Sequence, residues 1–218
     1  RSQLHRLLAE NTWIFGEEFS LSVDDKSLTE VLRKYLALKG IETEVDTPVK
    51  RIDGRKGIVD LMLTRSIPCS RENELEHLVI ELKRPTVDIG AKELEQIESY
   101  AFAVAEDERF NGLDTRWTFW IISNGMDEHA KRRAKQANMP YGLIHQSDDK
   151  RISIWAKQWS EVLQSNRHRL KLFQTKLEFN ADRDVSLEFL KQTYANVLGG
   201  CDENGTDNLC TADSGANE

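Results

Sequence analysis

Apolar positions recur with different periods along the chain, and each period predicts an element. From Leu4 to Leu8 the apolar residues have helical spacing and lead into an aromatic turn at Gly16. A second helix is predicted from Ser27, a residue type that caps helices, to Gly40, a residue type that ends them. We therefore expect helices before any strand.

The next part of the chain has strand-like patterns. An uneven strand is predicted over residues 41–52, a turn over 53–57 and an alternating strand over 58–63, so the three are expected to form a hairpin. A polar loop over 66–76 separates this hairpin from an apolar strand over 77–83. Pro85 ends that strand, because proline cannot donate a ladder hydrogen bond.

The second half alternates helices with strands. Helical spacing covers residues 89–105, a basic helix is predicted over 127–137, and a long helix over 159–179. Apolar strands are predicted over 117–123, 142–145 and 152–155. This order predicts an α/β fold with a mixed central sheet flanked by helices. The expected organisation is N-terminal helices over 1–40, a core with C-terminal helices over 41–198, and a disordered acidic tail over 199–218.

Composition narrows the class of protein. The chain has 218 residues, 39% of them hydrophobic and 31% charged, and no apolar run approaches the roughly 18 residues that a membrane span needs. We expect a soluble protein without a membrane partner. The three cysteines form no Cys-x-x-Cys pair, which favours a reducing cytoplasm over a disulfide framework. The chain begins with Arg1, so an additional N-terminal region is expected in the full-length protein.

The net charge of −7 is unevenly distributed. Residues 199–218 hold five acids and no base, which leaves 30 basic against 32 acidic residues in the rest of the chain. A nuclease can have this balance, because its acids gather at a metal ion while lysines and arginines follow the phosphates. Charge therefore does not exclude a nucleic-acid substrate.

Two charged residues lie near the end of the apolar strand 77–83. Glu81 and Lys83 are two positions apart, so on a strand they point to the same face, and Asp60 on the preceding strand can lie beside them. With the backbone carbonyl of Leu82, the two carboxylates make an all-oxygen site that suits Mg²⁺, with Mn²⁺ as a substitute. Such an ion activates water, and Lys83 beside it can orient or deprotonate that water.

A helical pair follows the same strand. Gln96 and Tyr100 are four apart and share a helix face, so they can border the same pocket. The alternative is an ordinary buried pair of Glu81 and Lys83 in a sheet, with Gln96 and Tyr100 on an amphipathic surface. For an isolated Glu-x-Lys, that alternative is the commoner one.

The combination of motifs resembles a known superfamily. The segments that carry the resemblance are Gly57-Ile58-Val59-Asp60, Val79-Ile80-Glu81-Leu82-Lys83 and Gln96-Ile97-Glu98-Ser99-Tyr100. In this order they are similar to the G-x-x-D, E-x-K and Q-x-x-x-Y motifs of the PD-(D/E)xK nucleases, although Val59 stands where the name of the superfamily has proline. The resemblance covers residues 30–123. It implies a restriction-endonuclease-like fold and Mg²⁺-dependent cleavage of DNA by Asp60, Glu81, Lys83 and Gln96.

A narrower resemblance covers more of the chain. The segments Leu8 to Gly16 and Ile80 to Pro85, together with the helix of Gln96, are similar to the nuclease domain of Shedu anti-phage defence proteins. That resemblance implies a role in anti-phage defence, a homo-oligomer and a variable N-terminal region.

An acid on the first helix often completes the metal site in the superfamily, and Glu30 is the candidate by position. A solvated helix glutamate is an equally good interpretation, and Glu17 and Glu18 compete for the role.

Other residues offer weaker signals. Arg84, Lys131 and Arg132 are candidate contacts to a phosphate backbone, although an exposed basic face is the commoner explanation for the last two. The five histidines form no short-spaced ligand pair and are expected at the surface or at strand ends. RNA is not excluded as a substrate. The competing hypothesis is a catalytically inactive module that keeps the fold for nucleic-acid binding or oligomerisation.

Overall fold

The computed structural model describes residues 2–41, 44–51, 54–55, 57–65, 74–110 and 115–177. The chain divides into two compact units, Arg1–Arg169 and Leu170–Glu218, and of the second unit only residues 170–177 are described. The predicted acidic tail over 199–218 lies outside the described residues. Among the helices that are described, none combines the length and the apolar character needed to cross a bilayer.

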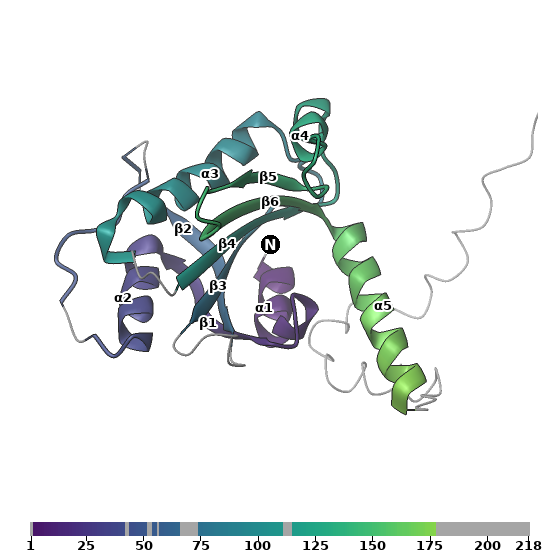
Figure 1. Ribbon diagram of the computed structural model, residues 1–218, viewed down its shortest axis with the longest axis horizontal. Helices are drawn as coiled ribbons and strands as arrows, with labels where there is room; N and C mark the ends of the chain where they lie inside the picture. The colour runs from purple at the N-terminus through teal and green to yellow at the C-terminus, as the bar shows by residue number, and fades with distance from the viewer. Residues whose placement is uncertain are drawn as a thin grey trace, which may run out of the picture. The chain divides into compact units, whose positions relative to one another are not determined.

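A six-stranded mixed sheet forms the centre of the first unit (Figure 1). Its strand order is β1-β2-β3-β4-β6-β5, in which β3, β4 and β6 run parallel and the other neighbours are antiparallel. The strands are β1 (Phe19–Ser27), β2 (Ile58–Arg65), β3 (Leu75–Leu82), β4 (Thr115–Ser123), β5 (Leu143–Gln146) and β6 (Ile152–Gln158). Helices flank this sheet, so the predicted α/β fold class is confirmed.

Helices cover both faces of the sheet. The helices are α1 (Ser2–Glu10), α2 (Leu28–Leu38), α3 (Ala91–Glu106), α4 (Glu128–Ala134) and α5 (Trp159–Leu177). Met62 and Val79 pack in the cluster that contains α2 and α3, whereas their neighbours Leu61 and Ile80 pack in the cluster that contains Leu8 of α1. This division follows from the pleat, which turns successive side chains to opposite faces. Because both faces are buried, the central strands are almost continuously apolar.

Helix α2 begins and ends where the capping residues predict. The Ser27 hydroxyl accepts a hydrogen bond from the Glu30 backbone N–H at 3.4 Å, which satisfies one of the first donors of the helix. Gly40 follows the last turn with φ +71°, and its N–H donates to the carbonyl of Ala37. A left-handed residue of this kind ends helices, and glycine adopts it without steric cost.

The predicted hairpin over residues 41–63 is wrong. Residues 44–51 form no strand beyond a single bridge position at Lys50. The antiparallel neighbour of β2 is instead β1, which precedes α2 and pairs Phe19 with Arg65 and Ser27 with Ile58. Residues 1–40 therefore contribute a strand of the sheet as well as helices. The pattern did not predict β1, because an edge strand needs little apolar surface and Val23 is its single buried residue.

His77 is also not where the sequence predicted. It lies inside β3 with an exposed fraction of 0%, its Nδ1 3.0 Å from the Thr64 hydroxyl and its ring 4.4 Å from the ring of Trp117. Burial lowers the pKa of His77 to about 3, and the positive charge of Lys39 adds to the effect. The imidazole is therefore a neutral part of the core.

Candidate active site

Strands β2 and β3 place Asp60 and Glu81 opposite each other. The antiparallel register pairs Leu61 with Ile80, so the next pair towards the end of the sheet is Asp60 with Glu81. Residues directly opposite in an antiparallel pair point to the same face, with Cβ atoms about 4.5–5.5 Å apart. Their exposed fractions are 3% and 2%, so both carboxylates are withdrawn from bulk water.

Leu82 contributes its backbone to the same place. Its N–H donates to Asp60 Oδ2 at 2.7 Å, whereas the next N–H, that of Lys83, turns to the other side and donates to the carbonyl of Ile122 in β4 at 2.9 Å. The N–H and C=O of one residue in an extended strand point to the same side. The carbonyl of Leu82 is therefore directed towards the side on which Asp60 lies.

Lys83, Gln96 and Glu81 form a closed network. Lys83 Nζ donates to Glu81 Oε1 at 3.0 Å and to Gln96 Oε1 at 2.6 Å, and Gln96 Nε2 donates to Glu81 Oε1 at 3.0 Å. The ammonium is a donor only and the carboxylate is an acceptor only, so both partners fix the same orientation of the Gln96 amide. Each of the three side chains therefore restrains the other two.

Tyr100 supports the network from one helical turn further along α3. Its hydroxyl accepts from Gln96 Nε2 at 2.8 Å and donates to the carbonyl of Ile58 at 3.0 Å. Burial raises the pKa of Tyr100, and the negative charge of Glu81 raises it further, so the phenol stays neutral and keeps its donor. The hydrogen bonds run in one direction from Lys83 through Gln96 and Tyr100 to the start of β2.

Helix α3 holds Gln96 and Tyr100 because its other face is buried. Leu94, Ile97 and Ala101 are at most 1% exposed and pack against the sheet. Gly90 is the N-cap of this helix, and an added Cβ there would lie 2.6 Å from Oδ2 of Asp127, the N-cap of α4. Glycine therefore allows α3 and α4 to begin side by side.

The network opens into a polar cleft of about 780 Å³. Its lining comes from α1, β1, β2, β3, α3, the segment before β2 and the residue that follows β3. The residues are His5, Arg6, Asp24, Asp25, Arg51, Ile58, Asp60, Glu81, Lys83, Gln96 and Tyr100. The structure thus brings Asp60, Glu81, Lys83, Gln96 and Tyr100 together, and adds six residues that the sequence analysis did not single out for the site.

His5 is one of these additional residues. Its Nε2 lies 2.9 Å from Asp24 Oδ1 and 2.9 Å from the backbone carbonyl of Asp60. Both partners are acceptors, so Nε2 carries the proton. Its N–H is shared between the two oxygens. His5 therefore joins α1 to β1 and β2 beside a proposed metal ligand. No spacing signal pointed to it, because the partner residues are 19 and 55 positions away in the sequence.

Arg51 is another. Its Nε donates to Ser99 Oγ at 2.8 Å, and its guanidinium carbon lies 5.4 Å from the centre of the Tyr100 ring. These contacts fix a cation in the wall of the cleft. Asp25 contributes an exposed acid on β1 and has φ +48°, a left-handed conformation that is uncommon for a residue other than glycine and often occurs at functional sites.

The structure does not bring the remaining candidates to this cleft. Glu30 forms an ion pair with Arg33 on α2 and lines two other surface depressions. Glu17 pairs with Arg169 at 2.6 Å. Arg84, Lys131 and Arg132 are exposed and are not among the residues that line it.

The donor set fits a hard divalent cation. Within the described ranges, no three side chains of the types His, Cys, Asp and Glu come together as a metal cluster. Mg²⁺ does not need such a cluster, because it keeps several waters and commonly binds through one or two carboxylates. Asp60, Glu81 and the carbonyl of Leu82 are all oxygen donors, and Lys83 beside them offsets part of the negative charge.

Comparison with known proteins gives one structural match. The chain is similar to a repair endonuclease from Pyrococcus abyssi, with 15% sequence identity, a TM-score of 0.37, and coverage of 72% of this chain and 46% of that one. The chain therefore spans less than half the length of that protein, and a likeness this weak carries no weight in assigning a function. No family model and no curated protein matches the sequence.

Proposed function

We propose that this chain is a Mg²⁺-dependent nuclease that hydrolyses phosphodiester bonds of DNA. The observation that carries the proposal is the convergence of Asp60, Glu81, Lys83 and Gln96 in one cleft, with the two carboxylates in register on neighbouring strands. Burying two carboxylates costs free energy, and a site that binds a cation explains why both are retained.

Each residue of the site would have its own role in the reaction. Asp60, Glu81 and the Leu82 carbonyl would hold Mg²⁺, with Mn²⁺ as a substitute, and the bound ion supplies Lewis-acid stabilisation and an acidified water. Lys83, as an ammonium, would orient the attacking water and offset charge on the phosphate. Gln96 holds the Lys83 ammonium at 2.6 Å and so fixes its direction relative to Glu81.

The cleft also suits a phosphate backbone. Arg6 and Arg51 line it together with Lys83, so three cationic side chains share the cleft with its carboxylates. Cations of this kind position a nucleic acid through its phosphates without reading its sequence. DNA is the proposed substrate, and RNA offers the same phosphate charge, so the experiment below includes it.

The proposed setting is anti-phage defence, in a homo-oligomer whose chains carry an additional N-terminal region. This part of the proposal is supported by the similarity of residues 8–16 and 80–85 to Shedu nuclease domains. The competing function is a catalytically inactive module that binds nucleic acid or oligomerises. An intact set of Asp60, Glu81, Lys83 and Gln96 favours catalysis, because a site that has lost its activity usually loses a carboxylate or the lysine.

The test is cleavage of supercoiled plasmid by the purified chain in Mg²⁺. The variants are Asp60→Asn, Lys83→Ala and a matched control, Lys34→Ala, which removes an exposed lysine of α2 outside the cleft. We expect cleavage by the wild type and by Lys34→Ala, and a loss of about 10²–10⁴-fold in the other two. Chelation by EDTA should abolish the activity, and a parallel assay uses single-stranded RNA.

Two outcomes would contradict the proposal. Cleavage that persists in Asp60→Asn and Lys83→Ala would show that another group or a contaminant cuts the plasmid. A wild-type chain that shifts plasmid in a gel but leaves it intact, with correct folding shown by circular dichroism, would establish the inactive module instead.

A further inference from the structure

A second cavity lies at the opposite end of the sheet from the candidate active site. It borders Thr115 and Ile152, the first residues of β4 and β6, whereas Glu81 is at the far end of the parallel strand β3. Its volume is about 200 Å³. The residues that line it are Val104, Ala105, Phe110, Thr115, Trp117, Ser147, Asp149, Arg151 and Ile152. None of them lines the polar cleft of the candidate active site.

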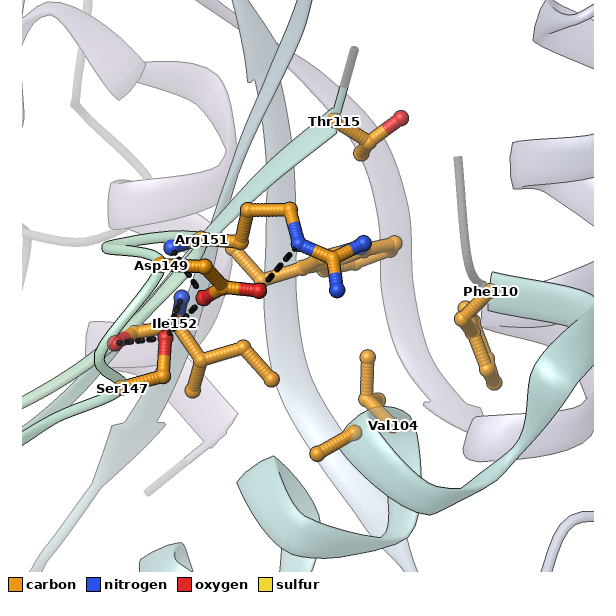
Figure 2. A pocket seen from close by; sticks show the side chains of 9 residues that line it. Val104, Phe110, Thr115, Ser147, Asp149, Arg151 and Ile152 are labelled. Carbon is orange, nitrogen blue, oxygen red and sulfur yellow. Dashed lines mark hydrogen bonds and ion pairs between the residues drawn. The ribbon is translucent and has the colours of Figure 1, made fainter. Parts of the chain in front are cut away.

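One side of this cavity is apolar. Val104, Phe110 and Ile152 have exposed fractions of at most 8% and face a common space (Figure 2). Trp117 also lines this cavity. Phe110 and Trp117 meet edge to face, with ring centres 5.4 Å apart. This wall suits the apolar part of a ligand, because pockets for small molecules are lined mainly by hydrophobic and aromatic side chains.

Arg151 supplies a directed polar group. Its backbone N–H and its Nε both donate to Asp149, at 3.0 Å and 2.5 Å, and Ser147 holds the same carboxylate at 2.6 Å. Figure 2 shows the two terminal nitrogens of Arg151 turned away from Asp149, into the space between Thr115, Phe110 and Val104. Asp149 therefore anchors one side of the guanidinium and leaves the other side directed at the cavity.

The charge of Asp149 persists over the ordinary pH range. The hydroxyl of Ser147, followed by the backbone and side-chain N–H groups of Arg151, holds the pKa of this carboxyl at about 2. Because the carboxylate stays ionised, the position of the guanidinium is fixed before any ligand arrives. Binding then costs little side-chain entropy.

We infer that this cavity is a binding site for a small planar ligand that presents two adjacent hydrogen-bond acceptors on one edge. The terminal nitrogens of Arg151 form a fork that matches such an edge, as in a carboxylate or in the O6 and N7 atoms of guanine. The apolar part of the ligand lies on the side of the cavity that Val104, Phe110 and Ile152 line. A volume below the roughly 300–1,000 Å³ of pockets for drug-sized ligands limits the occupant to one ring system.

Calorimetry on the full chain tests this assignment with matched pairs of probes. Guanosine and benzoate carry the paired acceptors, whereas adenosine and benzamide have similar rings with a donor at one of the two positions. Arg151→Lys keeps the charge and removes the fork, so it should weaken binding at least about tenfold. The matched control is Arg116→Lys, an exposed arginine of β4 that pairs with Glu74 and does not line the cavity.

Each result decides the question. Binding of guanosine or benzoate, weak binding of its matched analogue, and loss of affinity in Arg151→Lys but not in Arg116→Lys would support the site, and the probe that binds identifies the source. A shift of one indole N–H signal in NMR, absent in Trp117→Phe, would place the ligand at Trp117. Failure of both probes, or equal affinity in the wild type and Arg151→Lys, would overturn the inference. Lys83→Ala should bind as the wild type does, so the result is independent of nuclease activity.

Discussion

Glu81 Oε1 accepts from both the ammonium of Lys83 and the amide of Gln96. This arrangement satisfies a buried carboxylate that would otherwise be costly at 2% exposure. It also means that Lys83 and Gln96 cannot move independently of Glu81. At the scale of single residues, the site is therefore a preorganised unit, and the removal of each member should have a different effect.

Gln96→Ala should slow cleavage while Mg²⁺ binding is largely retained. The amide is neutral and holds Lys83 and Glu81 in place, so its loss impairs positioning more than metal affinity, by about 10–100-fold in rate. Calorimetry with Mg²⁺ and turnover of plasmid measure the two effects separately.

The matched control is Glu95→Ala, which changes an exposed neighbour on the same helix. Loss of Mg²⁺ binding in Gln96→Ala, with unchanged turnover at saturating Mg²⁺, would reverse the role that we assign to this residue.

At the scale of elements, α1 contributes His5 and Arg6 to the lining of the cleft, and His5 bonds to the neighbouring strands. His5 donates from Nε2 to Asp24 and to the backbone of Asp60, so it links the first helix to the edge strand and to β2. We regard His5 as a positioning residue for Asp60. A helix at the start of the chain thereby restrains a residue 55 positions away.

His5→Ala should lower kcat by about tenfold with little change in KM, because it loosens the backbone that carries Asp60. His5→Gln should restore much of the rate, since its amide N–H can replace the donor at Nε2. His168→Gln on the exposed part of α5 is the control. Equal rates in all of these variants would show that the contact is structural only.

Ser27 ends β1 and caps α2, so strand and helix follow without a loop. Ser27→Ala should lower the free energy of unfolding by about 1 kcal/mol, because it removes the acceptor for the Glu30 N–H. Urea denaturation measures the change, with Ser160→Ala, an exposed serine of α5, as the control. A Ser27→Ala midpoint equal to that of the wild type would contradict the capping role.

At the scale of the whole molecule, acid should unfold the protein partly through His77. The unfolded chain binds a proton at His77 near pH 6.5, whereas the folded chain does so only near pH 3, because the ring is buried. Between these values the unfolded state binds more protons, so stability falls as the pH is lowered. At about 1.4 kcal/mol per pKa unit, this single residue can cost several kcal/mol by pH 3.

The variant His77→Phe should have a smaller loss of stability over the same pH window. Thermal unfolding of the wild type and the variant at a series of pH values gives the difference in their stability. The carboxylates are common to both proteins, so their contribution cancels in this difference. Curves that stay parallel from pH 7 to pH 4 would show that His77 does not control acid stability.

The two cavities also belong to this scale. The polar cleft lies at one end of the sheet and the cavity of Arg151 lies at the other, with the strands of the core between them. Because they share no lining residue, each can be tested by variants that leave the other intact.

The sequence by itself determined the elements whose signals are local. The start of α2 at Ser27, its end at Gly40 and the helical face that carries Gln96 and Tyr100 each depend on residues a few positions apart. The same holds for Glu81 and Lys83, which share a face because strand side chains alternate. The placement of Asp60 beside them was predictable from its position on the preceding strand, and the register agrees.

Tertiary structure alone decided which distant segments meet. β1 displaced the predicted strand over 41–52 as the neighbour of β2, and this brought Asp24 and Asp25 to the cleft. Packing of α1 and of the segment before β2 brought His5 and Arg51 there, while α2 directed Glu30 to Arg33 instead. Pairing of an edge strand and docking of a helix depend on surfaces buried across many tens of residues. Such contacts have no periodic signature, because each segment has the same local pattern whichever partner it meets.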